Sequence, residues 1–297
     1  MSSKVLLGTS IAPNSRLEIQ KSALESWAEN GFDIVSFNTP YEILTLSKNF
    51  PAISFIPIMR TGEKYAGKPL PLISDILQYL NLADQKYCGI VNSDIYFSSS
   101  TPLSDVIKEY AKNSFVYGAR FDVNNLKSQE GKYDPLGFDY FIFDKRITNK
   151  WDDNRFCLGM PFWDHWFPLI PILNGHTVKK IIAPIARHAT HPNSWGTSTL
   201  AFNDEFIRIL IDYQMRDIQT QNNKKLNEIL VAFKEIEIQH PYYQIKVKLQ
   251  EQSDQSLDNP ETYSYIEDLA KLFDRVTRDT LKFIENHSEI IKLKLNS

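Results

Sequence analysis

Residues 1–121 alternate short apolar runs with amphipathic stretches, and this alternation constrains the fold more than any other feature of the chain. The apolar runs predict strands at Val5–Thr9, Asp33–Phe37, Ala52–Ile58, Tyr87–Tyr96 and Ser114–Phe121. Apolar residues at helical spacing between them predict helices at Arg16–Asn30, Pro40–Ser47, Pro71–Leu82 and Pro102–Ala111. Regular alternation of this kind favours a mostly parallel sheet flanked by helices, so we predict an α/β fold.

Polar side chains follow the predicted strands at the edge where their carboxyl ends meet, and ligands of open α/β sheets bind at this edge. Hydroxyl and amide groups can hold a base and ribose, and arginine or lysine can face phosphate oxygens. The residues that we assign to a nucleotide-diphosphate site for these reasons are Thr9, Ser10, Asn38, Arg60, Lys64, Asn92 and Ser93. For the two cations, a solvated loop is the alternative. The chain contains neither GxGxxG nor GxxxxGKS/T, so neither a Rossmann cofactor site nor a P-loop is predicted.

Asp94 is the most informative residue at this edge. It follows Cys88–Val91, an apolar run that predicts a buried central strand. A carboxylate at the exit of a buried strand needs a partner. A divalent cation that bridges it to a diphosphate would supply one, because Mg²⁺ and Mn²⁺ prefer hard oxygen ligands. The alternatives are a turn cap and an ion pair with a lysine.

The order of these elements, closed by an apolar strand and a short acidic motif, resembles the GT-A nucleotide-sugar glycosyltransferases. Their motif is Asp-any-Asp, and Asn92-Ser93-Asp94 matches it except at the first position. The resemblance covers roughly residues 4–195. It implies a GT-A-like fold, a nucleotide-sugar donor, and Mn²⁺ or Mg²⁺ held by Asp94, which occupies the position of the family's metal-binding carboxylate. Asn92 could then contact the ribose or the donor sugar.

Two acidic residues downstream extend this interpretation. Asp139 lies early in the predicted strand Gly137–Phe143, and we assign it to donor binding. Asp164 opens a predicted helix, which resembles the place of the acceptor-side base in inverting GT-A enzymes. Partial burial would raise its pKa toward the range useful for a general base. Trp163 and Trp166 could stack on the acceptor sugar; alternatively, both tryptophans belong to the core and Asp164 is an N-cap.

Two histidines follow the predicted strand Val178–Ala183, in a chain that has six. The resemblance implies that a late histidine joins the acidic motif on the same cation, so His188 or His191 would complete the metal site of Asp94. His188 follows the strand more closely and is the preferred candidate. The spacing alone is not a zinc signature, because no third histidine or cysteine lies nearby. Alternatively, one histidine is hydrogen-bonded in a loop, the other is exposed, and Arg187 faces the diphosphate.

The composition changes near residues 197–203. All eleven glycines and all five tryptophans lie before this point, and Leu, Ile, Lys, Glu, Gln and Asn at helical spacing dominate beyond it. The loss of turn residues indicates long elements, which Pro241 and Pro260 divide into about four helices. We therefore predict a GT-A-like catalytic domain at 1–200 and a C-terminal α-helical accessory region at 201–297. The tail Ile290–Leu295 is weakly amphipathic and could touch a membrane.

Charge and apolar content exclude several classes of protein. The net charge is −3, from 33 basic and 36 acidic residues, so no basic excess indicates a nucleic-acid binder. No run reaches the ~18 apolar residues of a membrane span, and residues 1–10 do not have the pattern expected of a signal peptide. We therefore expect a cytoplasmic protein, with peripheral contact at the inner face of the membrane left open. Cys88 and Cys157 lack CxxC spacing and are expected to be buried thiols.

These observations predict a glycosyltransferase that moves a sugar from a nucleotide-diphosphate donor to a glycan or glycolipid hydroxyl. We expect it to be inverting, assisted by Mn²⁺ or Mg²⁺, and active in surface polysaccharide biosynthesis. A sugar nucleotidyltransferase is one alternative, although Gly8 stands alone where that activity would need a glycine-rich first loop. A non-catalytic carbohydrate-binding or scaffold protein on a degenerate transferase fold is another.

Overall fold

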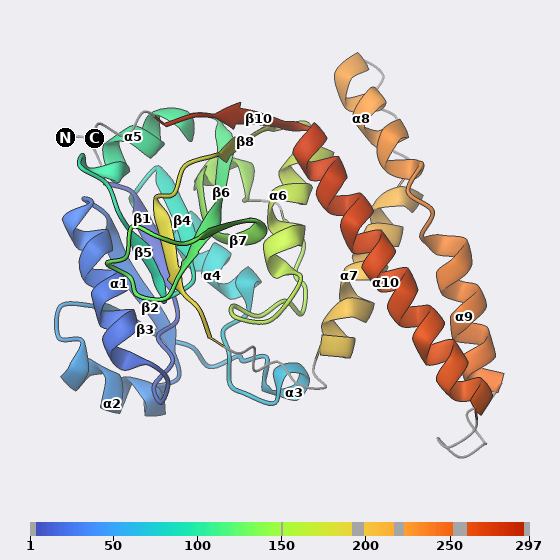
Figure 1. Ribbon diagram of the computed structural model, residues 1–297, viewed down its shortest axis with the longest axis horizontal. Helices are drawn as coiled ribbons and strands as arrows, with labels where there is room; N and C mark the ends of the chain where they lie inside the picture. Colours follow the sequence, from blue (N-terminus) through green and yellow to red (C-terminus); the bar gives the residue numbers. More distant parts are fainter. Residues whose placement is uncertain (1–3, 150, 192–198, 217–222, 252–259, 294–297) are drawn as a thin grey trace.

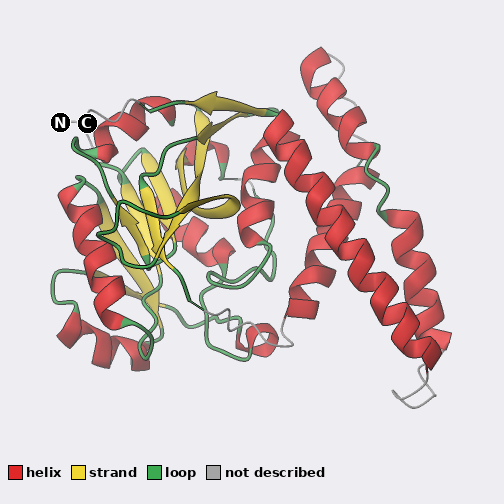
Figure 2. Ribbon diagram, in the orientation of Figure 1, coloured by secondary structure: helices red, strands yellow, loops and turns green. Residues whose placement is uncertain are grey.

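The computed structural model describes residues 4–149, 151–191, 199–216, 223–251 and 260–293. A ten-stranded sheet lies at the centre, and helices pack on both of its faces (Figure 1, Figure 2). The strands are β1 (Leu6–Thr9), β2 (Asp33–Asn38), β3 (Ser54–Pro57), β4 (Tyr87–Val91), β5 (Ile95–Phe97), β6 (Ser114–Val123), β7 (Lys132–Asp144), β8 (Thr177–Ile181), β9 (Ala186–Ala189) and β10 (Ser288–Ile291). The α-helices are α1 (Leu17–Glu29), α2 (Pro40–Asn49), α3 (Glu63–Ala66), α4 (Ile73–Leu82), α5 (Leu103–Tyr110), α6 (Trp163–Leu173), α7 (Thr199–Met215), α8 (Lys224–Lys234), α9 (Gln239–Glu251) and α10 (Pro260–Asn286).

Neighbouring strands follow the order β10-β8-β6-β7-β4-β1-β2-β3, and β9 pairs with β5 and β6 beside this path. β7 runs antiparallel to β4 and β6, and every other pair along the path is parallel. This is the mostly parallel, helix-flanked sheet expected from the sequence. The predicted α/β class is confirmed.

Side chains of the central strands alternate between two apolar cores, one on each face of the sheet. On one face, Leu6, Cys88 and Ile90 join a core that includes α4 and α6. On the other face, Leu7 and Val91 join a core that includes α1 and α5. Because helices cover both faces, ligands of such a sheet bind at the edge formed by the carboxyl ends of its strands.

The predicted strand Tyr87–Tyr96 is two strands, β4 and β5, joined by the turn Asn92–Asp94. β4 pairs with β1 and β7, whereas β5 pairs with β9. Asn92 N donates to Asp139 O on β7, and Ile95 N donates to Asn92 O, which closes the turn. The acidic motif therefore leaves the sheet at the carboxyl end of β4. The sequence predicted a single strand because the residues before and after the turn are both apolar.

Two short strands, β9 and β10, were not expected from the sequence. β9 inserts between β5 and β6, and β10 adds to β8 in parallel at the edge of the sheet. Of the tail Ile290–Leu295, expected to be weakly amphipathic, Ile290 and Ile291 lie in this edge strand, and residues 294 and 295 lie outside the described residues. Each strand has four residues and pairs with partners that are distant in sequence, so the local pattern carries little signal.

The C-terminal part forms four α-helices in its described residues, as expected. They lie at one end of the sheet (Figure 1), where α8 and α10 pack against α6 and α9 packs against α10. Phe206, Leu210 and Phe283 join the core of α4 and α6. Of the predicted boundary 197–203, residues 197 and 198 lie outside the described residues, and the chain is helical from Thr199. The division into two domains stays a prediction. Among the described residues, no helix combines the length and the apolar character needed to cross a membrane.

Candidate functional site

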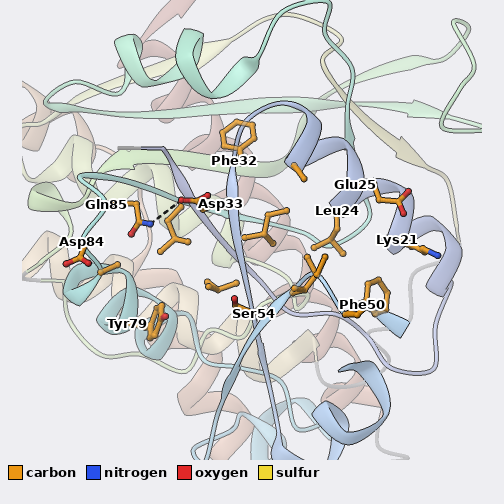
Figure 3. A pocket seen from close by; sticks show the side chains of 18 of the residues that line it. Lys21, Leu24, Glu25, Phe32, Asp33, Phe50, Ser54, Tyr79, Asp84 and Gln85 are labelled. Carbon is orange, nitrogen blue, oxygen red and sulfur yellow. Dashed lines mark hydrogen bonds between the residues drawn. The ribbon is translucent and has the colours of Figure 1, made fainter. Parts of the chain in front are cut away.

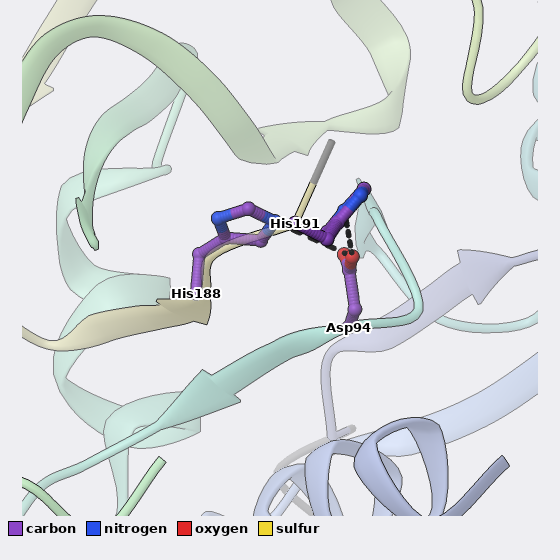
Figure 4. Close-up of side chains that lie close together, drawn as sticks. All are labelled: Asp94, His188 and His191. Atoms are coloured by element: carbon purple, nitrogen blue, oxygen red, sulfur yellow. Dashed lines mark ion pairs between the residues drawn. The ribbon is translucent and has the colours of Figure 1, made fainter. Parts of the chain in front are cut away.

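Asp94, His188 and His191 lie together at the carboxyl edge of the sheet (Figure 4). Asp94 Oδ2 is 3.4 Å from Nε2 of His188 and 3.4 Å from Nε2 of His191. One possible ligand atom from each residue lies within 4.8 Å of the other two. The fold therefore brings together the three residues that the sequence predicts for the metal site.

The position of β9 explains how this cluster forms. β9 pairs antiparallel with β5 and parallel with β6, so His188 lies in register with both Ile95 and Asp122. Asp94 immediately precedes Ile95, so the pairing fixes the first histidine beside the acidic motif. His191 lies in the segment directly after β9. The positions of both histidines are therefore set by the short strand β9.

Carboxylates face both ring nitrogens of His188, which is buried. Nδ1 lies 2.9 Å from Asp122 Oδ1, and Nε2 faces Asp94. Burial lowers the pKa of His188, but the two carboxylates outweigh it and raise this pKa above its usual range. Burial also raises the pKa of Asp94, yet hydrogen bonds from His188 and His191 outweigh it and hold that pKa well below its usual range. Asp94 is therefore ionised at neutral pH, as a metal ligand must be.

This donor set fits a divalent cation. Two atoms that each lie about 2.1 Å from one ion are about 3.0 Å apart at an octahedral right angle and about 3.4 Å apart at a tetrahedral angle. The two measured distances of 3.4 Å are close to these values. Two imidazoles and one carboxylate form a softer set than the all-oxygen set that Mg²⁺ prefers. Asp122 accepts from Nδ1–H and so leaves Nε2 of His188 to face a metal.

Asp139 and Arg120 link the acidic motif to β6 and β7. Asn92 Nδ2 donates to Asp139 Oδ1, and Arg120 Nη1 donates to Asp139 Oδ2 at 3.0 Å. Arg120 Nε also donates to Asp122 Oδ1 at 2.9 Å, and this is the oxygen that faces His188. Asn92 and Asp139, both predicted to bind the donor, thus lie at the site and bind each other. One continuous network of hydrogen bonds connects Asn92 with His188.

Asp164 lies in the first turn of α6, and Phe162 is the N-cap, so Asp164 is not the cap of this helix. Its side chain is 24% exposed, and Oδ1 has no hydrogen-bond partner among the described residues. Burial raises the pKa of Asp164, and the charge of Asp139 adds to this rise, while His165, with Nε2 3.7 Å from Oδ2, opposes it. Oδ1 itself is buried, so the exposed part of the side chain lies elsewhere on it. A partly exposed carboxylate with a raised pKa is suited to general-base chemistry.

Trp163 and Trp166 are core residues rather than a platform for a sugar. Trp163 is 2% exposed and packs on Phe141, and Trp166 is 3% exposed and packs on Trp151. Stacking on a sugar requires an open aromatic face, and neither indole offers one. The predicted acceptor role of these two residues is therefore corrected. Both side chains anchor α6 in the core and so fix the place of Asp164.

The polar residues at the ends of β1, β2 and β4 lie at the carboxyl edge, where the sequence predicts them. Asn38 is buried and donates to a backbone carbonyl of the loop after β1 at 2.9 Å. Ser93 Oγ donates to Gln20 Oε1 at 2.7 Å. Thr9 is fully buried, and its Oγ1 has no partner among the described residues; Ser10 beside it is partly exposed. Their role in donor binding stays a prediction.

Arg60 and Lys64, the cations predicted to face phosphate, have other surroundings. Arg60 donates to Asp75, and its Nη1 lies 2.6 Å from Asp153 Oδ2. Two carboxylates already hold this guanidinium, so the predicted phosphate contact is not open in this arrangement. Lys64 is exposed on the short helix α3, with Nζ 5.9 Å from the ring centroid of Tyr65. Nothing in this geometry places either cation beside Asp94.

Four residues of the site were not predicted from the sequence. They are Arg16, Gln20, Arg120 and Asp122. Arg16 Nη1 lies 3.9 Å from Asp94 Oδ2, and its Nη2 donates to Ala189 O at 2.7 Å. Arg16 could have been predicted because it is a cation shortly after the first strand. Asp122 could have been predicted because it is a carboxylate directly after the predicted strand Ser114–Phe121, at the same edge of the sheet. The role of Asp122 becomes clear only from the register of β6 with β9, which places it beside His188.

A cavity of about 800 Å³ lies at the opposite edge of the sheet. Asp33 and Gln85, which share a hydrogen bond of 3.3 Å, line one part of it, and Lys21 and Glu25 of α1 line another (Figure 3). None of the residues that the sequence predicts for the site lines this cavity. Among the described residues, the group of side chains that could hold a metal, Asp94, His188 and His191, lies at the carboxyl edge, so we place the candidate site there.

No protein-family profile matches the chain, and no curated protein matches it in sequence. A mannosyltransferase from Pyrobaculum calidifontis in complex with GDP-Man and Mn²⁺ aligns with 95% of this chain and 86% of its own, at 10% identity and a TM-score of 0.45. TarS 1–349 from S. aureus aligns with 96% of this chain and 91% of its own, at 10% identity and a TM-score of 0.43. The inositol-1-phosphate CTP transferase from T. maritima aligns with 61% of this chain and 85% of its own, at 12% identity and a TM-score of 0.38. A likeness at this level carries no argument about activity, which rests on the site.

Proposed function

We propose that the chain is a glycosyltransferase that moves a sugar from a nucleotide-diphosphate donor to a hydroxyl group, with a divalent cation at Asp94, His188 and His191. The observation that carries this proposal is the convergence of these three side chains at the carboxyl end of β4, where Asp94 directly follows Asn92-Ser93. A cation held there would face a diphosphate bound at the edge where open α/β sheets take their ligands.

Mn²⁺ is the proposed ion, because two imidazoles and one carboxylate suit it better than Mg²⁺. When bound, the ion supplies positive charge that offsets the charge developing on the departing diphosphate. The chain supplies the orientation of the ligands. Asp122 and Arg120 hold His188 with Nε2 toward Asp94.

Asp164 is the proposed general base on the acceptor side. The acceptor hydroxyl gives its proton to the Asp164 carboxylate as its oxygen attacks the anomeric carbon of the donor sugar, and the nucleoside diphosphate leaves from the opposite face. This course inverts the configuration at that carbon. The partial exposure of the Asp164 side chain and its raised pKa support the assignment. The acceptor is proposed as a glycan or glycolipid hydroxyl in surface polysaccharide biosynthesis, on the cytoplasmic side.

A thermal-shift experiment with UDP, GDP, dTDP and CMP, each with and without Mn²⁺, tests the donor site. We expect at least one nucleoside diphosphate to raise the melting temperature only when Mn²⁺ is present. Asp94→Ala should abolish this shift, and Asp33→Ala, in the cavity at the opposite edge, should preserve it. If no nucleotide gives a shift that depends on Mn²⁺, the proposal is wrong.

The products of the reaction separate this activity from its alternatives. Release of a nucleoside diphosphate from a nucleotide sugar, dependent on an acceptor, indicates glycosyl transfer. Release of pyrophosphate from a nucleoside triphosphate and a sugar phosphate indicates nucleotidyl transfer. Stabilisation by an oligosaccharide alone, with no effect of any nucleotide, indicates a carbohydrate-binding protein.

A further inference from the structure

Arg16 has an unusual backbone conformation beside the cluster of Asp94, His188 and His191. It is the N-cap of α1, with φ 47° and ψ 44°, in the left-handed region that few non-glycine residues adopt. Its Nη2 donates to Ala189 O at 2.7 Å. Ala189 is the last residue of β9 and lies between the two histidines in the chain. This bond therefore links the loop after β1 to the segment that carries both histidines.

The second terminal nitrogen of Arg16 faces the proposed metal ligand. Nη1 lies 3.9 Å from Asp94 Oδ2, the same oxygen that faces both histidines. This nitrogen is buried and has no hydrogen-bond acceptor among the described residues. A guanidinium keeps its charge at every physiological pH. Arg16 therefore places a permanent positive charge beside the site, and its Nη1 can still donate a hydrogen bond.

We infer that Arg16 couples the binding of the divalent cation to the binding of the diphosphate. The inference rests on the nucleotide-diphosphate site proposed above. A positive charge beside Asp94 opposes a dication at the same carboxylate, because like charges repel strongly where water is partly excluded. A diphosphate reverses this effect, since its oxygens can accept from Nη1 and its negative charge offsets both cations.

The consequence is that the cation and the diphosphate bind weakly apart and tightly together. Coupling of this kind is reciprocal: each ligand raises the affinity of the other by the same factor. Arg16 thus disfavours the metal alone and favours the metal–diphosphate pair. Removal of its charge should change the two affinities in opposite directions, which the loss of a purely structural contact would not do.

Titration calorimetry with Mn²⁺ alone, and then with UDP or GDP at saturating Mn²⁺, measures both affinities. Arg16→Gln removes the charge and keeps a donor for Ala189 O. We expect this variant to bind Mn²⁺ alone severalfold more tightly and to bind the diphosphate about 5–150-fold more weakly, the usual range of coupling between sites. Lys21→Gln removes one positive charge from the same helix, in the cavity at the opposite edge, and should change neither affinity.

Arg16→Lys is a second variant, which keeps the charge and loses the planar fork. It should bind Mn²⁺ alone as the wild type does and the diphosphate severalfold more weakly; tighter binding of Mn²⁺ alone to this variant would contradict the inference. If Arg16→Gln weakens both affinities together, or leaves the affinity for Mn²⁺ alone unchanged, the inference is overturned. Wild-type protein with no Mn²⁺-dependent binding of a diphosphate would overturn the proposed function itself.

Discussion

Asp122 determines which ring nitrogen of His188 faces Asp94. Its Oδ1 accepts from Nδ1 of the histidine and also from Nε of Arg120, so the carboxylate is itself held in place. The sequence predicted His188 as a ligand because it follows a strand and because of the family resemblance. It could not predict Asp122, because this residue meets the histidine only through the register of β6 with β9.

Asp122→Asn should weaken the binding of Mn²⁺ by about 10–100-fold, the usual effect of losing the partner of a metal-ligating histidine. An asparagine amide can donate to Nδ1, which favours the tautomer with its proton on Nε2, the nitrogen that must bind the metal. Calorimetry with Mn²⁺ and a nucleoside diphosphate measures the change. Asp134→Asn is the matched control, because Asp134 Oδ2 lies 3.1 Å from Arg120 Nη2 and Asp134 has no contact with His188 among the described interactions. If both variants lose the same Mn²⁺ affinity, the affinity depends on the hydrogen-bond network around Arg120 and not on the tautomer of His188.

Asp164→Asn should lower kcat by about 10²–10⁴-fold, the usual contribution of a general base. The melting temperature should change little, because Phe162 rather than Asp164 caps α6. The wild-type rate should rise with pH through the raised pKa of Asp164, since the base must be deprotonated, and the variant should lack this rise. Kinetics across a pH series, with melting curves as the control for folding, test the assignment. A variant with near-full turnover would leave Asp164 without a catalytic role.

At the scale of helices and strands, local signals predicted most of the first half of the chain. The helix α2 begins with a capping box, in which Thr39 accepts from Glu42 N and Glu42 accepts from Thr39 N, and a proline follows the cap. The helices α1 and α4 carry an apolar stripe at helical spacing. β9 and β10 have no such signal, because each is held by pairing with strands that are distant in the sequence.

Gly89 in β4 shows how closely the central strands approach one another. A Cβ added at this position would lie 2.5 Å from Phe141 O and 2.7 Å from Leu7 Cδ2. Gly89→Ala should therefore lower the free energy of unfolding by about 1–3 kcal/mol, the usual cost of overpacking, even though alanine is normally favoured over glycine within a strand. Urea denaturation measures this loss.

Gly8→Ala on the neighbouring strand β1 is the control for this prediction. Its nearest neighbours would be side-chain atoms of Phe37 at 3.1 Å and Ile76 at 3.2 Å, which can shift by a few tenths of an ångström. We expect a smaller loss of stability there. Equal stability of the two variants would contradict the view that the backbone carbonyl of β7 is what excludes a side chain from Gly89.

At the scale of the whole molecule, the chain returns to the sheet after its helical part. The composition break predicted four helices, and the structure adds β10, which pairs with β8 (Figure 2). The candidate site also depends on distant parts of the chain, since Asp94 and His188 come from two segments that β9 brings together. A sequence pattern can predict each segment but not which segments become neighbours.

A buried charge joins the end of the helical part to the sheet. Lys180 on β8 is 3% exposed, and its Nζ donates to Glu285 of α10 and to Pro135 O at 3.2 Å, above the ring of Phe138. Glu285→Ala would leave the ammonium group with one carbonyl acceptor. Because Glu285 is 44% exposed, water can replace part of the lost contact, so we expect a loss of about 1–3 kcal/mol in the free energy of unfolding.

Lys180→Met in the Glu285→Ala background separates the lost pair from lost packing. Methionine removes the unpaired charge and keeps an apolar chain against Phe138, so this double variant should recover most of the stability, since replacing a buried pair with apolar groups is often neutral. Glu289→Ala, an exposed carboxylate on β10, is the control and should change little. Urea denaturation of the wild type, the two single variants and the double variant measures the free energy of unfolding of each. If Glu285→Ala costs no more than Glu289→Ala, or if Lys180→Met recovers nothing, the ion pair does not hold α10 to the sheet. The apolar contacts of α10 and the pairing of β10 with β8 would then hold it.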